Sequence, residues 1–208
     1  KLSAYPVAVL LPAAFALKWL HSDERQRRAR LIDAFACLVL AAVVSVIVFR
    51  LFQPYAFSGP GFFGFKPNPQ WVANIREQRV QAAGDVDFPP ALQWARRPVW
   101  FSFQNLTLWG LGLPMSILAW AGFLWLGWRM LADRSPGRQA LFQHGLLWGW
   151  TAFYFVWQSL QFNPTMRYQL PVYPGLAIFA AWCVVALYDL GAEHLADATQ
   201  PVQRRRAG

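Results

Sequence analysis

Charged residues are scarce in this chain, and their scarcity excludes an ordinary soluble domain. Only 14% of its 208 residues are charged, 56% are hydrophobic, and the mean hydropathy is +0.26. A soluble domain has charged residues at about 25% of its positions. Apolar runs of about 20 residues recur along the sequence, and each is long enough to cross a hydrocarbon core about 30 Å thick. The composition therefore predicts a multi-pass membrane protein.

Cysteine and histidine are also rare, which argues against a disulfide framework or a metal centre built from them. The two cysteines, Cys37 and Cys183, lie inside apolar runs, where a free thiol packs as a small hydrophobic side chain. The three histidines, His21, His144 and His194, show no metal-ligand spacing. The sequence also contains no glycine-rich phosphate loop and no nucleophile elbow.

Five apolar segments predict an all-α fold, a multi-pass bundle of about five transmembrane helices. They cover residues 2–20, 31–52, 106–131, 140–160 and 170–190. The segment 53–105 is a long polar loop between the second and third of them, and residues 191–208 form a tail. Because the chain begins at Lys1 with no charged leader region, we expect it to be the C-terminal fragment of a longer polytopic protein.

Positive charge is concentrated near short connections, and this distribution predicts the orientation. It surrounds the first connection, the third connection and the end of the chain, at Lys18, Arg25, Arg27, Arg28, Arg30, Arg129, Arg134, Arg138, Arg204, Arg205 and Arg206. Short loops rich in Lys and Arg stay in the cytoplasm. The loop 53–105 is then outside and the tail 191–208 is cytoplasmic. The net charge of +9 fits contact with membrane lipids, and we expect no nucleic-acid partner.

The sequence predicts a short helix inside the outward loop. Asn68 can cap it, Pro69 suits its first position and Gly84 suits its end. Apolar residues fall on one face of this helix, at Trp71, Val72, Ile75 and Ala82. We expect an amphipathic helix that lies on the outer membrane surface, with Trp71 dipping into it.

Two acids follow that helix and are candidates for chemistry. Asp85 and Asp87 are two residues apart, so in an extended segment their side chains point the same way. Carboxylate oxygens suit Mg²⁺ or Mn²⁺, and the pair could hold such an ion, contact an acceptor or supply a general base. The alternative is a solvated turn, in which Asp85 makes local backbone bonds after Gly84.

Arginines and tryptophans come next in the loop. Arg96 and Arg97 could hold a lipid phosphate, because guanidinium groups bind phosphate through two parallel hydrogen bonds; the alternative is head-group anchoring. Trp94 and Trp100 could line a sugar or lipid groove. Packing of the loop into a small folded cap is the alternative role for both rings.

A second candidate site precedes the last apolar segment. Arg167 and Tyr168 follow a short turn and come just before two prolines, Pro171 and Pro174. An arginine at the mouth of a membrane span is costly unless it reaches the head groups or binds an anion. Arg167 could therefore hold an oxygen of a lipid phosphate, or it could serve as an anchor.

Four stretches give the chain a resemblance to a known group of membrane proteins. They are FRLFQPYAFSGPGFF, DFPPALQWARRPVWF, NLTLWGLGLPMSILAWAGF and NPTMRYQLPVYP, within residues 31–190. They resemble the YYY-type polytopic proteins of prokaryotes, which are related to GT-C glycosyltransferases of the dolichyl-phosphate-mannose mannosyltransferase kind. The resemblance implies a multi-pass protein of the prokaryotic plasma membrane that transfers a sugar from a polyprenyl-phosphate donor at the outer face.

The resemblance also limits what this chain can do. Such enzymes have their catalytic acid in an early outward loop, and no motif here matches that loop. Asp85 and Asp87 are not assigned that role, so we expect this part to bind the donor or the acceptor. Two alternatives remain open: a transporter or flippase for a lipid-linked precursor, and a non-catalytic membrane scaffold. Broken helices near the midplane are typical of the transporter.

Overall fold

The computed structural model describes residues 2–59, 61, 63–94, 96–133 and 139–206, with side chains described from Tyr5 to His194 except at position 91. Arg134 and Arg138, two of the residues used to predict orientation, lie outside this set. The chain forms two compact units. The first extends to Val99 and includes Leu160–Pro164, whereas the second contains Trp100–Ser159 and continues from Thr165.

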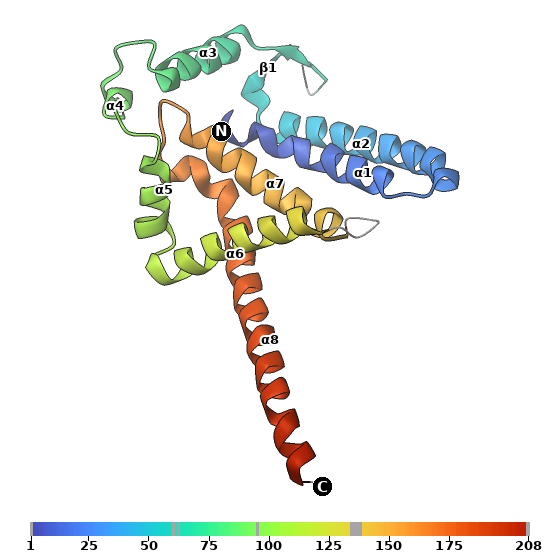
Figure 1. Ribbon diagram of the computed structural model, residues 1–208. Helices are drawn as coiled ribbons and strands as arrows, with labels where there is room; N and C mark the ends of the chain where they lie inside the picture. The colour runs from blue at the N-terminus through green and yellow to red at the C-terminus, as the bar shows by residue number, and fades with distance from the viewer. Residues whose placement is uncertain (1, 60, 62, 95, 134–138, 207–208) are drawn as a thin grey trace. The chain divides into compact units, whose positions relative to one another are not determined.

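The first unit is mainly helical. Its elements are the 3₁₀ helix η1 (Leu2–Val9), α1 (Leu10–Leu20), α2 (Glu24–Phe52), the 3₁₀ turn η2 (Pro54–Ala56), the strands β1 (Phe57–Ser58) and β2 (Lys66–Pro67), α3 (Pro69–Ala83) and α4 (Pro89–Leu92). Figure 1 shows α1 lying beside α2. The strands pair antiparallel, with Phe57 opposite Pro67 and Ser58 opposite Lys66.

The turn between α1 and α2 is held by basic side chains around a buried serine. The Ser22 hydroxyl donates to the Lys18 carbonyl oxygen at 2.5 Å, and Arg30 Nη1 donates to Ser22 Oγ at 2.7 Å. Arg27 Nε donates to the Ser22 carbonyl oxygen at 3.2 Å, and its guanidinium lies 5.4 Å from the centre of the Trp19 ring. Part of the predicted basic turn therefore has a structural role in closing the helical hairpin.

The end of α2 anchors the start of the long loop. Arg50, in the last turn of α2, is buried; its Nη2 donates to the Gly61 carbonyl oxygen at 3.0 Å and its guanidinium lies 5.4 Å from the Phe57 ring. Phe49 contacts Phe57 and Trp71 edge-on, with ring centroids 5.7 and 5.9 Å apart. The Trp71 ring, which we expected to dip into the membrane, is half-buried in this aromatic contact.

The helix α3 begins and ends at the capping residues that the sequence predicts. Asn68 Oδ1 accepts the Gln70 backbone N–H at 3.0 Å, and Pro69 occupies the first helical position. At the other end Gly84 has a φ of +80°, and the Asp85 N–H donates to the Val80 carbonyl oxygen at 3.2 Å, as in a Schellman cap.

The second unit is also helical. Its elements are α5 (Phe101–Asn105), a π-helical turn η3 (Leu106–Gly110), α6 (Leu113–Ala132), α7 (Gln139–Ser159), the 3₁₀ helix η4 (Met166–Val172) and α8 (Tyr173–Arg206). The π turn is fastened to α6 by the Ser116 hydroxyl, which donates to the Thr107 carbonyl oxygen at 2.9 Å. The predicted segment 106–131 is therefore divided at Gly112, whose φ is +76°.

The helices α6 and α8 pack closely because α6 presents small residues to α8. Ala119 and Gly122 of α6 are buried, and a side chain at position 122 would collide with the carbonyl oxygen of Phe179 and crowd Cys183. Small residues at such an interface let two backbones approach, which is a frequent mode of helix association in membranes. Around this contact lies the core: Leu106, Ala119, Leu126, Tyr154, Val172, Leu176, Phe179 and Ala180.

Aromatic rings join α7 to α6. The Phe123 and Trp148 rings are stacked with centroids 4.7 Å apart, and Trp148 Nε1 donates to the Phe123 carbonyl oxygen at 2.8 Å. Gly127 leaves the space that the Trp148 indole fills. Trp148 is therefore a packing residue that joins α7 to α6.

Two prolines of the second unit lie at the beginnings of helices. Pro114 is in the first turn of α6 and Pro174 is in the first turn of α8, while Pro171 lies in η4. The backbone N–H of a first-turn residue has no partner within its helix, so a proline there removes no hydrogen bond.

Three helical stretches of the described chain are long and apolar enough to cross a membrane. They are Glu24–Phe52, Leu113–Ala132 and Met166–His194, and a shorter apolar helix covers Tyr5–Leu20. The all-helical fold class is thus confirmed, with one short strand pair as the exception among the described residues. The backbone of α8 remains helical to Arg206, through the region predicted as a tail.

Candidate functional site

Arg167 lies at the beginning of the last long apolar stretch, on the 3₁₀ helix η4. Its side chain is exposed, and its guanidinium lies 5.5 Å from the ring of the neighbouring Tyr168. Among the described residues this ring is the one partner that the structure gives Arg167. The charge is therefore not neutralised by a described carboxylate, and the guanidinium can accept an anion from outside.

Buried residues hold the backbone around Arg167 in place. Gln169 is fully buried, and its Nε2 donates to Ser159 Oγ at 3.2 Å and to the Phe155 carbonyl oxygen at 3.4 Å, both on α7. Val172 is also fully buried within the core of this unit. Arg167 is therefore exposed on a short helix, η4, whose backbone is held in place by buried Gln169 and Val172. Because this backbone is already ordered, little conformational entropy is lost when Arg167 binds a ligand.

We expect Gln169→Ala to lower the free energy of unfolding by about 2–4 kcal/mol, because it removes buried hydrogen bonds and leaves a cavity. Thermal unfolding in detergent, followed by tryptophan fluorescence, measures this loss. The matched control is Gln104→Ala on α5, an exposed glutamine of the same unit, which should change stability by less than about 0.5 kcal/mol. Equal effects of the two substitutions would show that Gln169 does not anchor η4.

The predicted arginine pair lies in the irregular segment after α4. Arg96 and Arg97 are both exposed, and the Arg97 N–H donates to the Trp94 carbonyl oxygen at 3.3 Å. Arg96 has a φ of +67° and is the one non-glycine residue with a positive φ in the described backbone. Such a conformation is unfavourable for a residue with a Cβ, and residues held in it cluster at active sites and ligand-binding segments.

The two predicted tryptophans differ in exposure. Trp94 is half-buried, whereas 60% of Trp100 is exposed. The half-buried ring of Trp94 is in keeping with a packing role. Trp100 leaves a broad aromatic surface accessible, as a ring must if it is to stack on a sugar or lie among lipids.

The predicted acids Asp85 and Asp87 are both exposed. The backbone N–H of Asp85 completes the C-terminal cap of α3, so this hydrogen bond fixes the position of Asp85. No group of three or more His, Cys, Asp or Glu side chains is close enough to hold a metal ion within the described part of the chain. The pair therefore offers at most two carboxylates, which an Mg²⁺ or Mn²⁺ ion would supplement with water or substrate phosphate.

The candidate residues fall into two separate sets, one in each unit. Asp85, Asp87, Trp94, Arg96 and Arg97 belong to the first unit. Trp100, Arg167 and Tyr168 belong to the second. The sequence treats Trp94 and Trp100 as one pair, whereas the structure assigns the two rings to different units.

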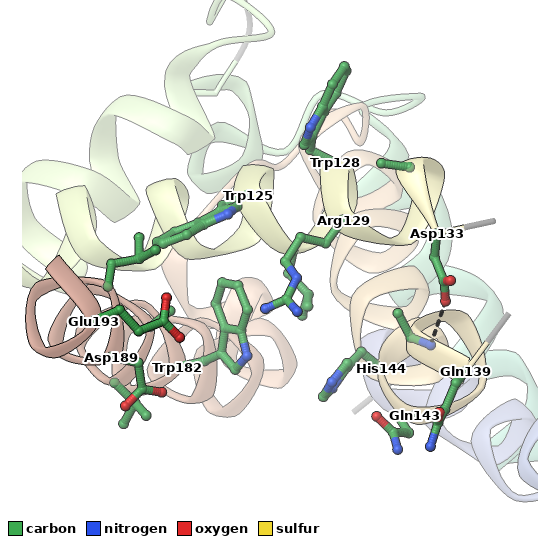
Figure 2. A pocket seen from close by; sticks show the side chains of 16 residues that line it. Trp125, Trp128, Arg129, Asp133, Gln139, Gln143, His144, Trp182, Asp189 and Glu193 are labelled. Atoms are coloured by element: carbon green, nitrogen blue, oxygen red, sulfur yellow. Dashed lines mark hydrogen bonds between the residues drawn. The ribbon is translucent and has the colours of Figure 1, made fainter. Parts of the chain in front are cut away.

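A pocket that the sequence did not predict lies in the second unit, between the end of α6, the beginning of α7 and the middle of α8 (Figure 2). Its volume is about 970 Å³, near the upper end of the range for small-molecule sites. The polar side chains at its wall are Arg129, Asp133, Gln139, Gln143, His144, Asp189 and Glu193, and its aromatic side chains are Trp125, Trp128 and Trp182.

Arg129 occupies the middle of this pocket. Its guanidinium lies 5.8 Å from the Trp182 ring, which itself meets Trp125 edge-on at 5.3 Å. Figure 2 shows Asp189 and Glu193 on one side of Arg129 and His144 on the other. Asp133 has a structural role, because its Oδ2 accepts the Ala140 N–H at 3.0 Å at the start of α7.

Sequence reasoning treated Arg129 only as an indicator of orientation and did not consider the acids. A usable signal was present: Asp189 and Glu193 are four residues apart near the end of the last apolar stretch, so they share one face of α8. What the sequence does not give is the crossing of α6 and α8 that brings them to Arg129.

No family model, curated protein or solved structure matches this chain. Its function is therefore inferred from its residues and their geometry, together with the resemblance carried by the four sequence stretches.

Proposed function

We propose that this chain forms the C-terminal part of a GT-C-like integral membrane glycosyltransferase that uses a polyprenyl-phosphate-linked sugar at the outer face of a prokaryotic plasma membrane. The observation that carries the proposal is the exposed Arg167 at the beginning of the Met166–His194 stretch, on a turn anchored by buried Gln169. A phosphate near the head-group level is the anion that such an arginine is best placed to meet.

The chemistry of Arg167 fits a lipid phosphate better than it fits a carbonyl or a sugar hydroxyl. A guanidinium presents a planar set of donors that match two phosphate oxygens, and charge-assisted hydrogen bonds of this kind are roughly twice as strong as neutral ones. The Tyr168 ring beside it supplies an amphipathic side chain suited to the interface between water and lipid. Together they would hold the phosphate of the donor and leave the sugar free to react.

The loop residues receive a second role in this proposal. Arg96 and Arg97 would contact a phosphate, and Trp94 and Trp100 would line a groove for the sugar or the lipid chain. Asp85 and Asp87 would contact the acceptor, or an Mg²⁺ or Mn²⁺ ion. The catalytic acid is assigned to none of these residues, since no motif in this chain matches the early outward loop of the family.

We further propose five spans, the three long apolar stretches together with Tyr5–Leu20 and α7 (Gln139–Ser159). The loop 53–105 would then be outside, with α3 along the membrane surface, and the end of α8 would be in the cytoplasm. The concentration of Lys and Arg around the first and third connections supports this orientation.

Membrane-impermeant thiol labelling tests the orientation in intact cells. In a Cys37→Ala background, Glu77→Cys on α3 should be labelled from outside, whereas Arg28→Cys at the start of α2 should be labelled only after permeabilisation. Both positions are exposed, so the same reagent can reach either once it is on the correct side. Labelling of Arg28→Cys in intact cells would reverse the proposed orientation.

Sugar transfer in membranes that contain the full-length protein tests the function itself. We expect Arg167→Ala to reduce transfer from a polyprenyl-phosphate donor about 10- to 100-fold, the loss typical of a hydrogen bond to a charged group. Asp87→Ala should reduce transfer less, since this acid contacts only the acceptor or an ion. Unchanged transfer in both variants would remove these residues from the proposal.

The helices α6 and α8 give the transporter alternative no support. It predicts spans broken near their middle, yet Pro114 and Pro174 lie in the first turns of α6 and α8. Uptake of a lipid-linked precursor into vesicles, with no glycosylated product, would favour that alternative over the enzyme.

A further inference from the structure

We propose that the pocket between α6, α7 and α8 binds the zwitterionic head group of an aminophospholipid, a phosphate ester joined to a primary ammonium group. This site is separate from Arg167. Its polar wall comes from the end of α6, the beginning of α7 and the second half of the Met166–His194 stretch, whereas Arg167 lies at the beginning of that stretch. Binding of such a lipid goes beyond the proposed function and does not require it.

The position of the pocket near helix ends favours a lipid head group. Arg129 is in the last turn of α6, Gln143 and His144 are in the second turn of α7, and Asp189 and Glu193 are near the end of the last apolar stretch. In the five-span arrangement proposed above, these helix ends lie where apolar stretches leave hydrocarbon for the head-group layer. The three tryptophans at the wall, Trp125, Trp128 and Trp182, are side chains enriched at that level.

The charges of the pocket favour a zwitterion over a simple anion or cation. Arg129 is its one arginine or lysine among the described lining residues, while Asp133, Asp189 and Glu193 are acidic, so the wall is negative overall. A simple anion would be repelled by the acids. A simple cation would leave the guanidinium in the middle without an anionic partner.

The side chains that would bind are available for a ligand. Arg129 contacts the Trp182 ring, and neither Asp189 nor Glu193 has a hydrogen bond or ion pair with another described residue. The guanidinium of Arg129 would hold the phosphate, with His144 beside it, and the two carboxylates would accept hydrogen bonds from the ammonium group. The Trp182 ring adds a surface that attracts cations.

An apolar strip continues from the polar wall and suits an acyl chain. Leu126 of α6 and Val185, Ala186 and Leu190 of α8 line the same pocket. A head group at Arg129 with a chain along these residues would satisfy both parts of a phospholipid. In the proposed orientation, the lipid would come from the cytoplasmic leaflet.

Native mass spectrometry of the full chain in detergent tests the proposal with three lipids that have identical acyl chains. The probes are phosphatidylethanolamine, phosphatidylglycerol, which lacks the ammonium, and a cationic diacyl-aminopropane lipid, which keeps a primary ammonium but lacks the phosphate. We expect phosphatidylethanolamine to be retained about tenfold more than either of the others, the effect of one additional charge-assisted hydrogen bond.

Variants assign that preference to the pocket. The double variant Asp189→Asn with Glu193→Gln should remove the preference for phosphatidylethanolamine over phosphatidylglycerol, and Arg129→Gln should remove its preference over the cationic lipid. Glu77→Gln and Arg79→Gln on α3 each delete a charge of the same sign at an exposed position of the other unit and should leave retention unchanged. Equal elution volumes in size-exclusion chromatography establish that each variant is folded.

Three results of the lipid comparison would overturn the proposal. They are equal retention of the three lipids by the parent protein, a lipid preference that survives in the pocket variants, and a stronger retention of the cationic lipid. Soluble phosphoethanolamine, added as a competitor, separates the sources of the ligand. Displacement of the lipid only at large molar excess supports a membrane lipid, whereas displacement at equal concentration would assign the pocket to a soluble zwitterion and overturn the assignment to a lipid.

Discussion

Replacement of Gly122 by alanine is expected to lower the melting temperature of the protein in detergent by about 5–10 °C. The added methyl group would collide with the carbonyl oxygen of Phe179, and a backbone oxygen cannot move aside as a side-chain end can. The helices α6 and α8 must then separate, at a cost of about 2–3 kcal/mol for an overpacked contact. For a chain of about this size, each kcal/mol corresponds to roughly 2–4 °C.

Gly149→Ala provides a matched control for this prediction. Gly149 lies within α7, and a methyl group built there meets no atom within 4 Å. Alanine stabilises a helix by about 0.5–1 kcal/mol relative to glycine, so this substitution should leave the melting temperature unchanged or raise it. If both variants unfold at the temperature of the parent protein, the close packing of α6 on α8 is wrong.

Substitution of Arg167 is expected to have the largest effect on ligand binding. Arg167→Ala should weaken the binding of a polyprenyl phosphate about 10- to 100-fold, because it removes the charge-assisted hydrogen bonds to the phosphate. Arg167→Lys should recover only part of this loss, since an ammonium group keeps the charge but not the planar pair of donors. Equilibrium binding to the protein in nanodiscs measures both.

Arg79→Ala is the control for the arginine variants. Arg79 is an exposed arginine on α3, in the other unit, and its removal deletes the same charge. Binding in this variant should match that of the parent protein. If Arg79→Ala and Arg167→Ala weaken binding equally, the effect reflects net charge and not a site at Arg167.

Local signals in the sequence predicted the helices well where those signals are strong. The run from Leu31 to Phe52 contains no proline and one internal acid, Asp33, and the structure has a continuous helix there, α2. Asn68 and Gly84 bound α3 as their side-chain chemistry and backbone freedom lead one to expect. These features depend on residues close together in the sequence, which is why they can be recognised without a structure.

The start of α6 was predicted less well. The apolar run from Leu106 continues without interruption in hydropathy, yet the helix proper begins at Leu113 because Gly112 takes a positive φ. Hydropathy does not register such a change of backbone conformation. A proline in an apolar run is likewise ambiguous, since it can kink a helix in its middle or start one.

The pocket between α6, α7 and α8 depends on tertiary structure and was not predicted. Arg129 and Glu193 are separated by more than 60 positions, and they line one pocket because α6 packs closely on α8, where Gly122 leaves room. In contrast, Arg167 was recognised from the sequence because its exposure and its neighbours follow from a short local turn. The proposed ligand of Arg167, a lipid phosphate, stays a prediction.

Photo-crosslinking with a polyprenyl phosphate that carries a diazirine next to its phosphate is the most direct test of a lipid-phosphate site at Arg167. After irradiation of the protein in nanodiscs, peptide mass spectrometry locates the modified residues. We predict modification within Thr165–Tyr173, and its loss in Arg167→Ala. Modification confined to other segments, or undiminished in Arg167→Ala, would contradict the proposal.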